Sequence, residues 1–90
     1  MAGSFTGMDI EAVRRLAGQM DQCAQNIQEI TGRLTSALEG TPWVGPDREQ
    51  FAGEWQGTHR QQLTAVCNGL TTAANKARTN ASEQETASGH

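Results

Sequence analysis

Apolar residues recur every seven positions in the first half of the chain, with no proline between residues 9 and 39. Three neighbouring columns are mostly apolar: Val13, Met20, Ile27 and Leu34; Leu16, Cys23, Ile30 and Ala37; Ile10, Ala17, Ala24, Thr31 and Leu38. Adjacent columns of this kind form one wide apolar stripe on a helix. Asp9 is a suitable N-cap, and Gly40 and Pro42 are stop signals. The pattern predicts a helix over about residues 9–39.

A second helical pattern begins at Pro46, a residue suited to the first position of a helix. Its apolar stripe consists of Ala52, His59, Leu63, Val66, Leu70, Ala73 and Ala77, with Cys67 and Ala74 beside it. The pattern fades after Ala81, and the residues that follow are mostly polar. We therefore expect a second helix over about residues 46–81 and a flexible tail over residues 82–90.

The link over residues 40–45 is short, so we expect the two helices to be antiparallel neighbours within one domain, residues 1–90. Leu, Ile, Val and Phe supply only 13 of 90 residues, whereas alanine supplies 12. Two helices cannot enclose stripes this wide with so few large side chains. The predicted fold class is therefore all-α, an antiparallel two-helix hairpin that dimerises into a four-helix bundle.

Charge and composition exclude several classes of function. The net charge is −3 with a pI near 5.2, which argues against a nucleic-acid partner. No apolar run approaches the roughly 18 residues of a membrane span, so we expect no stable membrane insertion. The N-terminal residues lack the apolar run of a cleavable signal peptide. These features predict folding in the cytoplasm, with any export taking place on the folded chain.

Catalytic and metal chemistry are also not expected. His59 and Cys67 are eight residues apart, about 12 Å along a helix, too far to share a metal or to form a catalytic pair. The glycines are spread singly, without a phosphate-binding loop. We therefore predict no enzymatic activity, no catalytic residue, no metal and no cofactor. We expect His59 to be a partly buried packing residue.

The triplet Trp43-Val44-Gly45 lies between the two predicted helices, and large apolar residues follow it at Phe51 and Trp55. In this arrangement, from about Ile10 to Ala81, the chain resembles the WXG family, small secreted proteins of bacterial type VII (ESX-type) secretion that include the early secreted antigenic target group. A second triplet, residues 55–57, falls inside a predicted helix, and we interpret it as fortuitous.

The resemblance implies a hairpin that pairs with itself or a related protein into an antiparallel four-helix bundle, is exported folded and is recognised by the type VII secretion ATPase. It also implies a tail signal, a tyrosine followed after three residues by Asp or Glu, acting beside the paired subunit's Trp-Xaa-Gly turn. This chain has no tyrosine. Glu83 and Glu85 match only the acidic element, so we expect this subunit to contribute Trp43, Val44 and Gly45 and a partner to contribute the signal.

A heterodimer with a second WXG-type hairpin is therefore preferred over a homodimer, and the expected location is outside the cell or at its surface. The alternatives are a self-associating homodimer of the same family and a cytoplasmic helical adaptor without an export role. Trp43 is either an export or partner determinant or a plug at the end of the hairpin. Gly45 is expected to serve the backbone turn.

The expected core or dimer-interface residues are the large apolar members of the stripes: Val13, Leu16, Met20, Ile27, Ile30, Leu34, Phe51, Trp55, Leu63, Val66 and Leu70. Cys23 and Cys67 are equidistant from residue 45 and so stand at the same height in an antiparallel pair. They form either an internal disulfide, if their Cβ atoms face each other, or two small buried thiols.

Overall fold

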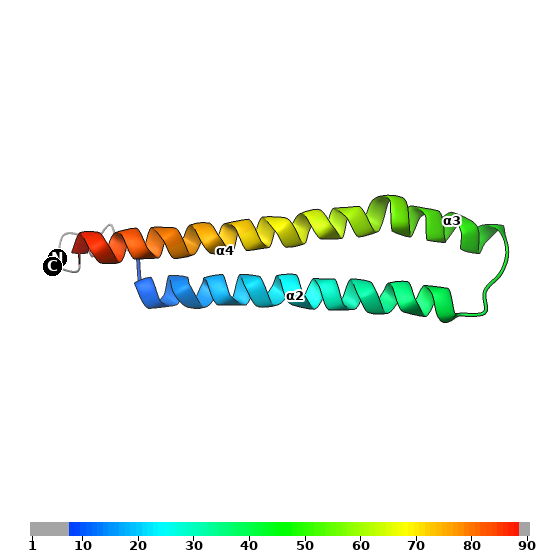
Figure 1. Cartoon of the computed structure of the whole chain (residues 1–90), viewed down its shortest axis with the longest axis horizontal. Coiled ribbons are helices and arrows are strands. Elements are labelled where there is room, and N and C mark those ends of the chain that lie inside the picture. The colour runs from blue at the N-terminus through cyan, green and yellow to red at the C-terminus, as the bar shows by residue number, and fades with distance from the viewer. Residues whose placement is uncertain (1–7, 89–90) are drawn as a thin grey trace.

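The computed structural model describes residues 8–88, and all regular structure in that range is helical. The elements are the helix α2 (Ile10–Gly40), the helix α3 (Pro46–Glu54), the π-helical turn η1 (Trp55–His59) and the helix α4 (Arg60–Ser88). The last three follow one another without a break, so the chain makes two long helical arms, the second bent near η1 (Figure 1). The all-helical prediction is confirmed.

The two ends of α2 are closed by side chains at their boundaries. The carboxylate of Asp9 accepts a hydrogen bond from the backbone N–H of Ala12 at 3.0 Å, which confirms the predicted N-cap. At the other end Gly40 is still helical and has no positive φ, and Thr41 is extended. The hydroxyl of Thr41 donates to the carbonyl of Ala37. The helix therefore ends one residue later than predicted, and its end is supported by Thr41 rather than by a left-handed glycine.

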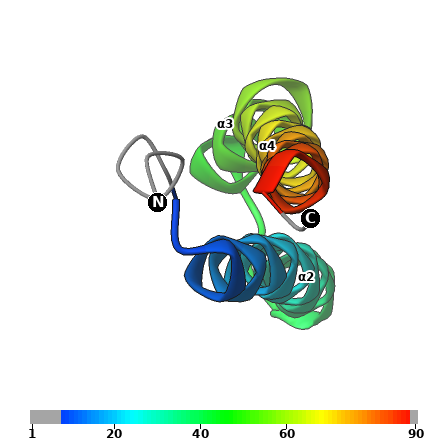
Figure 2. The ribbon, with the colours of Figure 1, turned by 90° about the vertical axis from the view of Figure 1, so that its left-hand side faces the viewer.

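Small side chains form the contact between the two arms. Apart from Trp55, the buried residues between 8 and 88 are Ala17, Ala24, Cys67, Ala74 and Ala81, and we call these five the seam. The thiol of Cys67 donates to the carbonyl of Ala24 at 3.5 Å, so α4 lies directly against α2 at this height. Figures 1 and 2 show the arms side by side and antiparallel. With extents of 66 × 17 × 15 Å, the molecule is one layer of helices.

The C-terminal part of α4 corrects one prediction. The residues from Ser82 onward were expected to form a flexible tail, but the helix continues to Ser88. Ala81 is fully buried against the other arm, and Glu85 forms an ion pair with Arg14 at 2.9 Å. The helix extends because these contacts hold it and because Glu, Gln and Ala are good helix formers. Residues 89–90 lie outside the described range.

The wider turn η1 interrupts the second arm where the sequence predicts one regular helix. Trp55, its first residue, is only 8% exposed, and its indole Nε1 donates to the hydroxyl of Thr35 at 2.9 Å. Since a π-turn inserts an extra residue into a helix, it changes the direction in which the following side chains point. The turn thus separates the aromatic end of the hairpin from the small-residue seam.

Candidate functional site

The turn between the arms, residues 41–45, is built around one backbone conformation. Gly45 has φ 134° and ψ 178°, a region that is essentially restricted to glycine. Its carbonyl accepts from the N–H of Glu49 at 3.1 Å, and Pro46 occupies the first helical position. Before it, the N–H of Trp43 donates to the carbonyl of Thr41 at 2.8 Å. The predicted backbone role of Gly45 is confirmed.

The other two residues of the triplet face solvent to different degrees. Trp43 is 41% exposed and lies against Phe51, with ring centroids 6.1 Å apart and planes tilted by 36°. This separation is typical of a favourable aromatic pair. Val44 is 94% exposed. Trp43 therefore packs on the end of the hairpin while part of its surface remains free, a position compatible with both of the roles that the sequence leaves open for it.

An apolar pocket of about 230 Å³ opens at this end of the molecule. Both arms and the turn contribute to its lining, which consists of Leu34, Ala37, Leu38, Thr41, Trp43, Phe51 and Trp55. The hydrogen bond between Trp55 and Thr35 fixes the most buried of these rings. The pocket has the chemistry to accept an aliphatic or aromatic side chain.

The predicted core and interface residues divide into two groups. Trp55 is buried, and five residues flank the seam half-buried: Val13, Met20, Ile27, Leu63 and Leu70. The other five remain between 43% and 51% exposed: Leu16, Ile30, Leu34, Phe51 and Val66. The hairpin alone therefore leaves about half of its large predicted interface side chains uncovered.

The two cysteines are at the predicted common height but do not face each other. Cys67 is buried and its thiol meets the carbonyl of Ala24, the residue after Cys23. Cys23 is exposed, and both thiols are free. The alternative of an internal disulfide is therefore not realised in this structure, and of the two predicted buried thiols only Cys67 is buried.

Two ion pairs that the stripes do not predict join the arms. Arg14 binds Glu85 at 2.9 Å, and Arg78 binds Asp21 at 2.6 Å. The hydrogen bond from Arg14 lowers the pKa of Glu85 and, reciprocally, raises that of Arg14. The residues of each pair are not equidistant from residue 45, so matching heights alone would not have found them; the signal in the sequence is that charges of opposite sign stand seven residues apart on both arms, Arg14 and Asp21 on α2 and Arg78 and Glu85 on α4.

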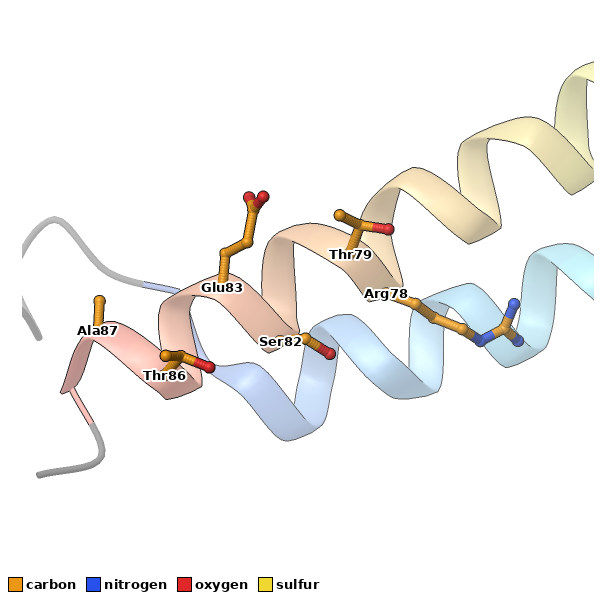
Figure 3. A pocket seen from close by; sticks show the side chains of 6 residues that line it. All are labelled: Arg78, Thr79, Ser82, Glu83, Thr86 and Ala87. Carbon is orange, nitrogen blue, oxygen red and sulfur yellow. The ribbon is translucent and has the colours of Figure 1, made fainter.

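Other features of the described range offer less chemistry. His59 is exposed, so the prediction of a partly buried packing residue is wrong; it lies in the wider turn η1, outside the seam. An open hollow near the end of α4 is lined by Arg78, Thr79, Ser82, Glu83, Thr86 and Ala87 (Figure 3). All six belong to one helix, and Arg78 already binds Asp21. Across residues 8–88, no cluster of three or more His, Cys, Asp or Glu side chains suits a metal ion.

No helix within residues 8–88 combines the length and apolar character needed to cross a bilayer. Comparisons with models of protein families, with curated proteins and with solved structures give no match. The function of this chain is therefore to be inferred from its own residues and from the resemblance of its turn.

Proposed function

We propose that this chain is a non-enzymatic substrate of a type VII (ESX-like) secretion system, exported as a folded helical dimer with a second hairpin of the same kind. The observation that carries the proposal is the triplet Trp43-Val44-Gly45 at the turn between two antiparallel helical arms. Gly45 holds a conformation that only glycine adopts readily, and Trp43 keeps 41% of its surface free beside an apolar pocket.

The uncovered side chains support the dimeric part of this proposal. Leu16, Ile30 and Val66 are each about half exposed, and the seam between the arms consists of small residues. A second hairpin would remove these large side chains from water at roughly 25 cal/mol per Å² of apolar surface. Pairing of hairpins into a four-helix bundle is a common way to bury such stripes.

We propose that the partner carries the export signal. The 90 residues contain no tyrosine, so the tyrosine-based tail signal that the family resemblance implies is not among them. In the proposed complex, a partner supplies that signal and this chain supplies the Trp43 turn, so that the secretion ATPase meets both together. The pocket beside Trp43 and Phe51 has room for an apolar side chain at that point.

Export from a bacterium that carries a type VII system and the cognate partners tests the proposal. We expect the wild-type chain in the culture medium, and we expect Trp43→Ala to reduce its secreted fraction about tenfold while its level in the cells is maintained. Val44→Ala, which trims an exposed side chain of the same turn, is the matched control and should be exported normally.

Two further measurements keep the result interpretable. Circular dichroism of purified Trp43→Ala should show wild-type helix content, and a cytoplasmic marker should remain in the cells. Retention of the wild-type chain with all plausible partners present would contradict the proposal. It would favour the alternative of a cytoplasmic helical adaptor.

A further inference from the structure

The net charge of the chain is concentrated at the end of the hairpin that carries the turn (Figure 1). We call residues 34–59 the tip; they comprise the end of α2, the turn, α3 and η1. The tip contains four carboxylates and one arginine, whereas the rest of the sequence contains six acidic and six basic residues and is neutral. Arg33 and Arg60 stand just outside the tip. The net charge of −3 of the whole chain is therefore the charge of its tip.

Most of the carboxylates of the tip have no basic partner. Arg48 lies 3.4 Å from Glu49. Glu39, Asp47 and Glu54 are exposed and form no ion pair with any of the described residues. The body of the hairpin differs, because two ion pairs join its arms. Three negative charges of the tip are thus left to interact with a ligand.

The C-terminal end of α2 adds to the negative potential of the tip. The last carbonyl groups of a helix carry a partial negative charge, and a basic side chain in the last turn offsets it. The last turn of α2 contains no basic residue, and Glu39 stands there instead. A positive group near this end is therefore attracted both by the helix dipole and by a carboxylate.

The tip also contains the apolar pocket of about 230 Å³. All Trp and Phe side chains of residues 8–88 line it: Trp43, Phe51 and Trp55. No charged residue belongs to its lining, and the indole N–H of Trp55 is already bonded to Thr35. The interior thus suits an uncharged, apolar side chain, and any charge of the ligand belongs at the rim.

The unpaired carboxylates border this pocket on both arms. On α3, Asp47 stands four residues before Phe51 and Glu54 three residues after it, and residues at these spacings share one face of a helix. On α2, Glu39 belongs to the same last turn as the pocket residues Ala37 and Leu38. An apolar centre with an acidic rim is the result.

We propose that the tip binds a basic peptide segment of another protein, with one apolar side chain of that segment in the pocket and its lysine or arginine neighbours beside the carboxylates at the rim. This inference goes beyond the proposed function, because it gives the chemistry of the segment that contacts the tip and does not depend on export. The competing occupant is an acidic segment, such as the tail signal that the family resemblance implies.

The two parts of the tip contribute differently to this contact. Burial of the apolar side chain among the aromatic rings supplies affinity, as anchor residues do at the centre of an interface. The carboxylates select the sign of charge that flanks the anchor, and they repel an acidic segment. Because these carboxylates are exposed, salt screens their attraction. We therefore expect weak binding that high salt weakens further.

Titration of the isotope-labelled full chain with synthetic peptides, followed by two-dimensional NMR spectra, tests the proposal. The probe is the capped peptide Lys-Lys-Leu-Lys-Lys, and its addition should shift the backbone signals of the pocket residues rather than those of the seam. Replacement of its leucine by glycine should weaken binding about tenfold, since the apolar anchor is lost. The capped peptide Glu-Glu-Leu-Glu-Glu should bind at least about tenfold more weakly than the probe.

Paired substitutions in the protein test the charges of the tip. Glu39→Gln with Glu54→Gln removes two carboxylates near the pocket and should weaken binding of the lysine peptide about fivefold. Glu29→Gln with Glu83→Gln removes two exposed carboxylates of the body and should change the affinity by less than about twofold. Both variants have the same net charge, so the comparison isolates the position of the charges.

Ala37→Phe tests the pocket by filling it from its own wall. Ala37 is exposed and lines the pocket, so the larger ring has room and the helix should be retained. The leucine peptide should then bind no more tightly than its glycine counterpart, because its anchor has lost the space that it fills. Circular dichroism must show wild-type helix content for each variant.

Equal or tighter binding of the glutamate peptide overturns the proposal and favours an acidic occupant. The proposal is also overturned if millimolar lysine peptide shifts no signal, if the shifts lie outside the tip, or if the paired substitutions at the tip and in the body have equal effects. None of these results decides whether the chain is exported, which the secretion assay measures separately.

Discussion

The three residues of the turn meet different physical demands. Gly45 is fixed by backbone geometry, since it is the one residue with positive φ among those described. Trp43 is half buried against Phe51, so its ring serves packing and remains accessible. Val44 is almost entirely in solvent, and the structure gives it no contact to preserve. This geometry therefore constrains the residue types at Trp43 and Gly45 and leaves Val44 unconstrained.

Replacing Gly45 by alanine should destabilise the hairpin. At φ 134° an added Cβ is strained even though nothing lies within 4 Å of its position, and the cost should be about 1–3 kcal/mol. Gly32→Ala is the matched control: it is an exposed mid-helix glycine and should stabilise by about 1 kcal/mol. Urea unfolding followed by circular dichroism at one protein concentration measures both. Equal effects of the two substitutions would contradict the strained conformation of Gly45.

At the scale of the elements, the last turns of α4 depend on a contact far away in sequence. Glu85 and Arg14 are joined by two hydrogen bonds, of 2.9 and 3.4 Å, across 71 residues. The ordinary local rules predict fraying here, because the stripe of α4 fades after Ala81 and the residues that follow are mostly polar. The ion pair and the buried Ala81 explain why the helix nevertheless continues to Ser88.

This contact makes part of the stability depend on acid. Because Arg14 lowers the pKa of Glu85, the stabilisation is present above the ordinary glutamate pKa and is lost as the pH falls through the lowered value. Between pH 6 and pH 3, the melting temperature of Glu85→Gln should therefore fall less than that of the wild-type chain. Glu83→Gln, which changes an exposed neighbour on the same helix, should keep the wild-type acid response. An unchanged acid response in Glu85→Gln would contradict the pair.

The helices and their caps could be predicted from the sequence, whereas the choice of contact face could not. Asp9 and the seven-residue repeat identify α2 to within one residue, and Pro46 identifies the start of the second arm. The stripe of α2, however, has three apolar columns, and period alone does not say which of them meets α4. The column of Ala17 and Ala24 forms the contact because small side chains let two helix backbones approach closely. The column of Leu16 and Ile30 is then left outside the contact between the arms.

The turn and the residues that follow it could be predicted only in part. The constraint on Gly45 followed from the resemblance and from its place beside Pro46, and φ 134° bears it out. The hydrogen bond between Trp55 and Thr35 was missed, although the two residues are equidistant from residue 45, as the cysteines are. The π-turn η1 has no seven-residue signature, since it arises from the packing of Trp55 against the other arm.

At the scale of the whole molecule, the seam determines how near the two arms lie and thus how much of each stripe stays outside. Ala17, Ala74 and Ala81 are completely buried, yet no large side chain is fully buried within the described range. A hairpin built this way has a thin contact between its arms, and much of each apolar stripe stays uncovered. This thin contact, rather than a local site, is why Leu16, Ile30 and Val66 stay about half exposed.

Enlarging a seam residue should therefore weaken the hairpin. Ala24 is 4% exposed and lies against Cys67, so Ala24→Leu adds a side chain where there is no space and should cost about 1–3 kcal/mol of unfolding free energy. Ala65→Leu makes the same change at an exposed position of α4 and should alter stability by no more than about 0.5 kcal/mol. Urea unfolding at a single protein concentration compares the two, so that any association of chains affects both measurements alike. If Ala24→Leu unfolds like wild type and Ala65→Leu does too, the two arms are not in close contact at this height.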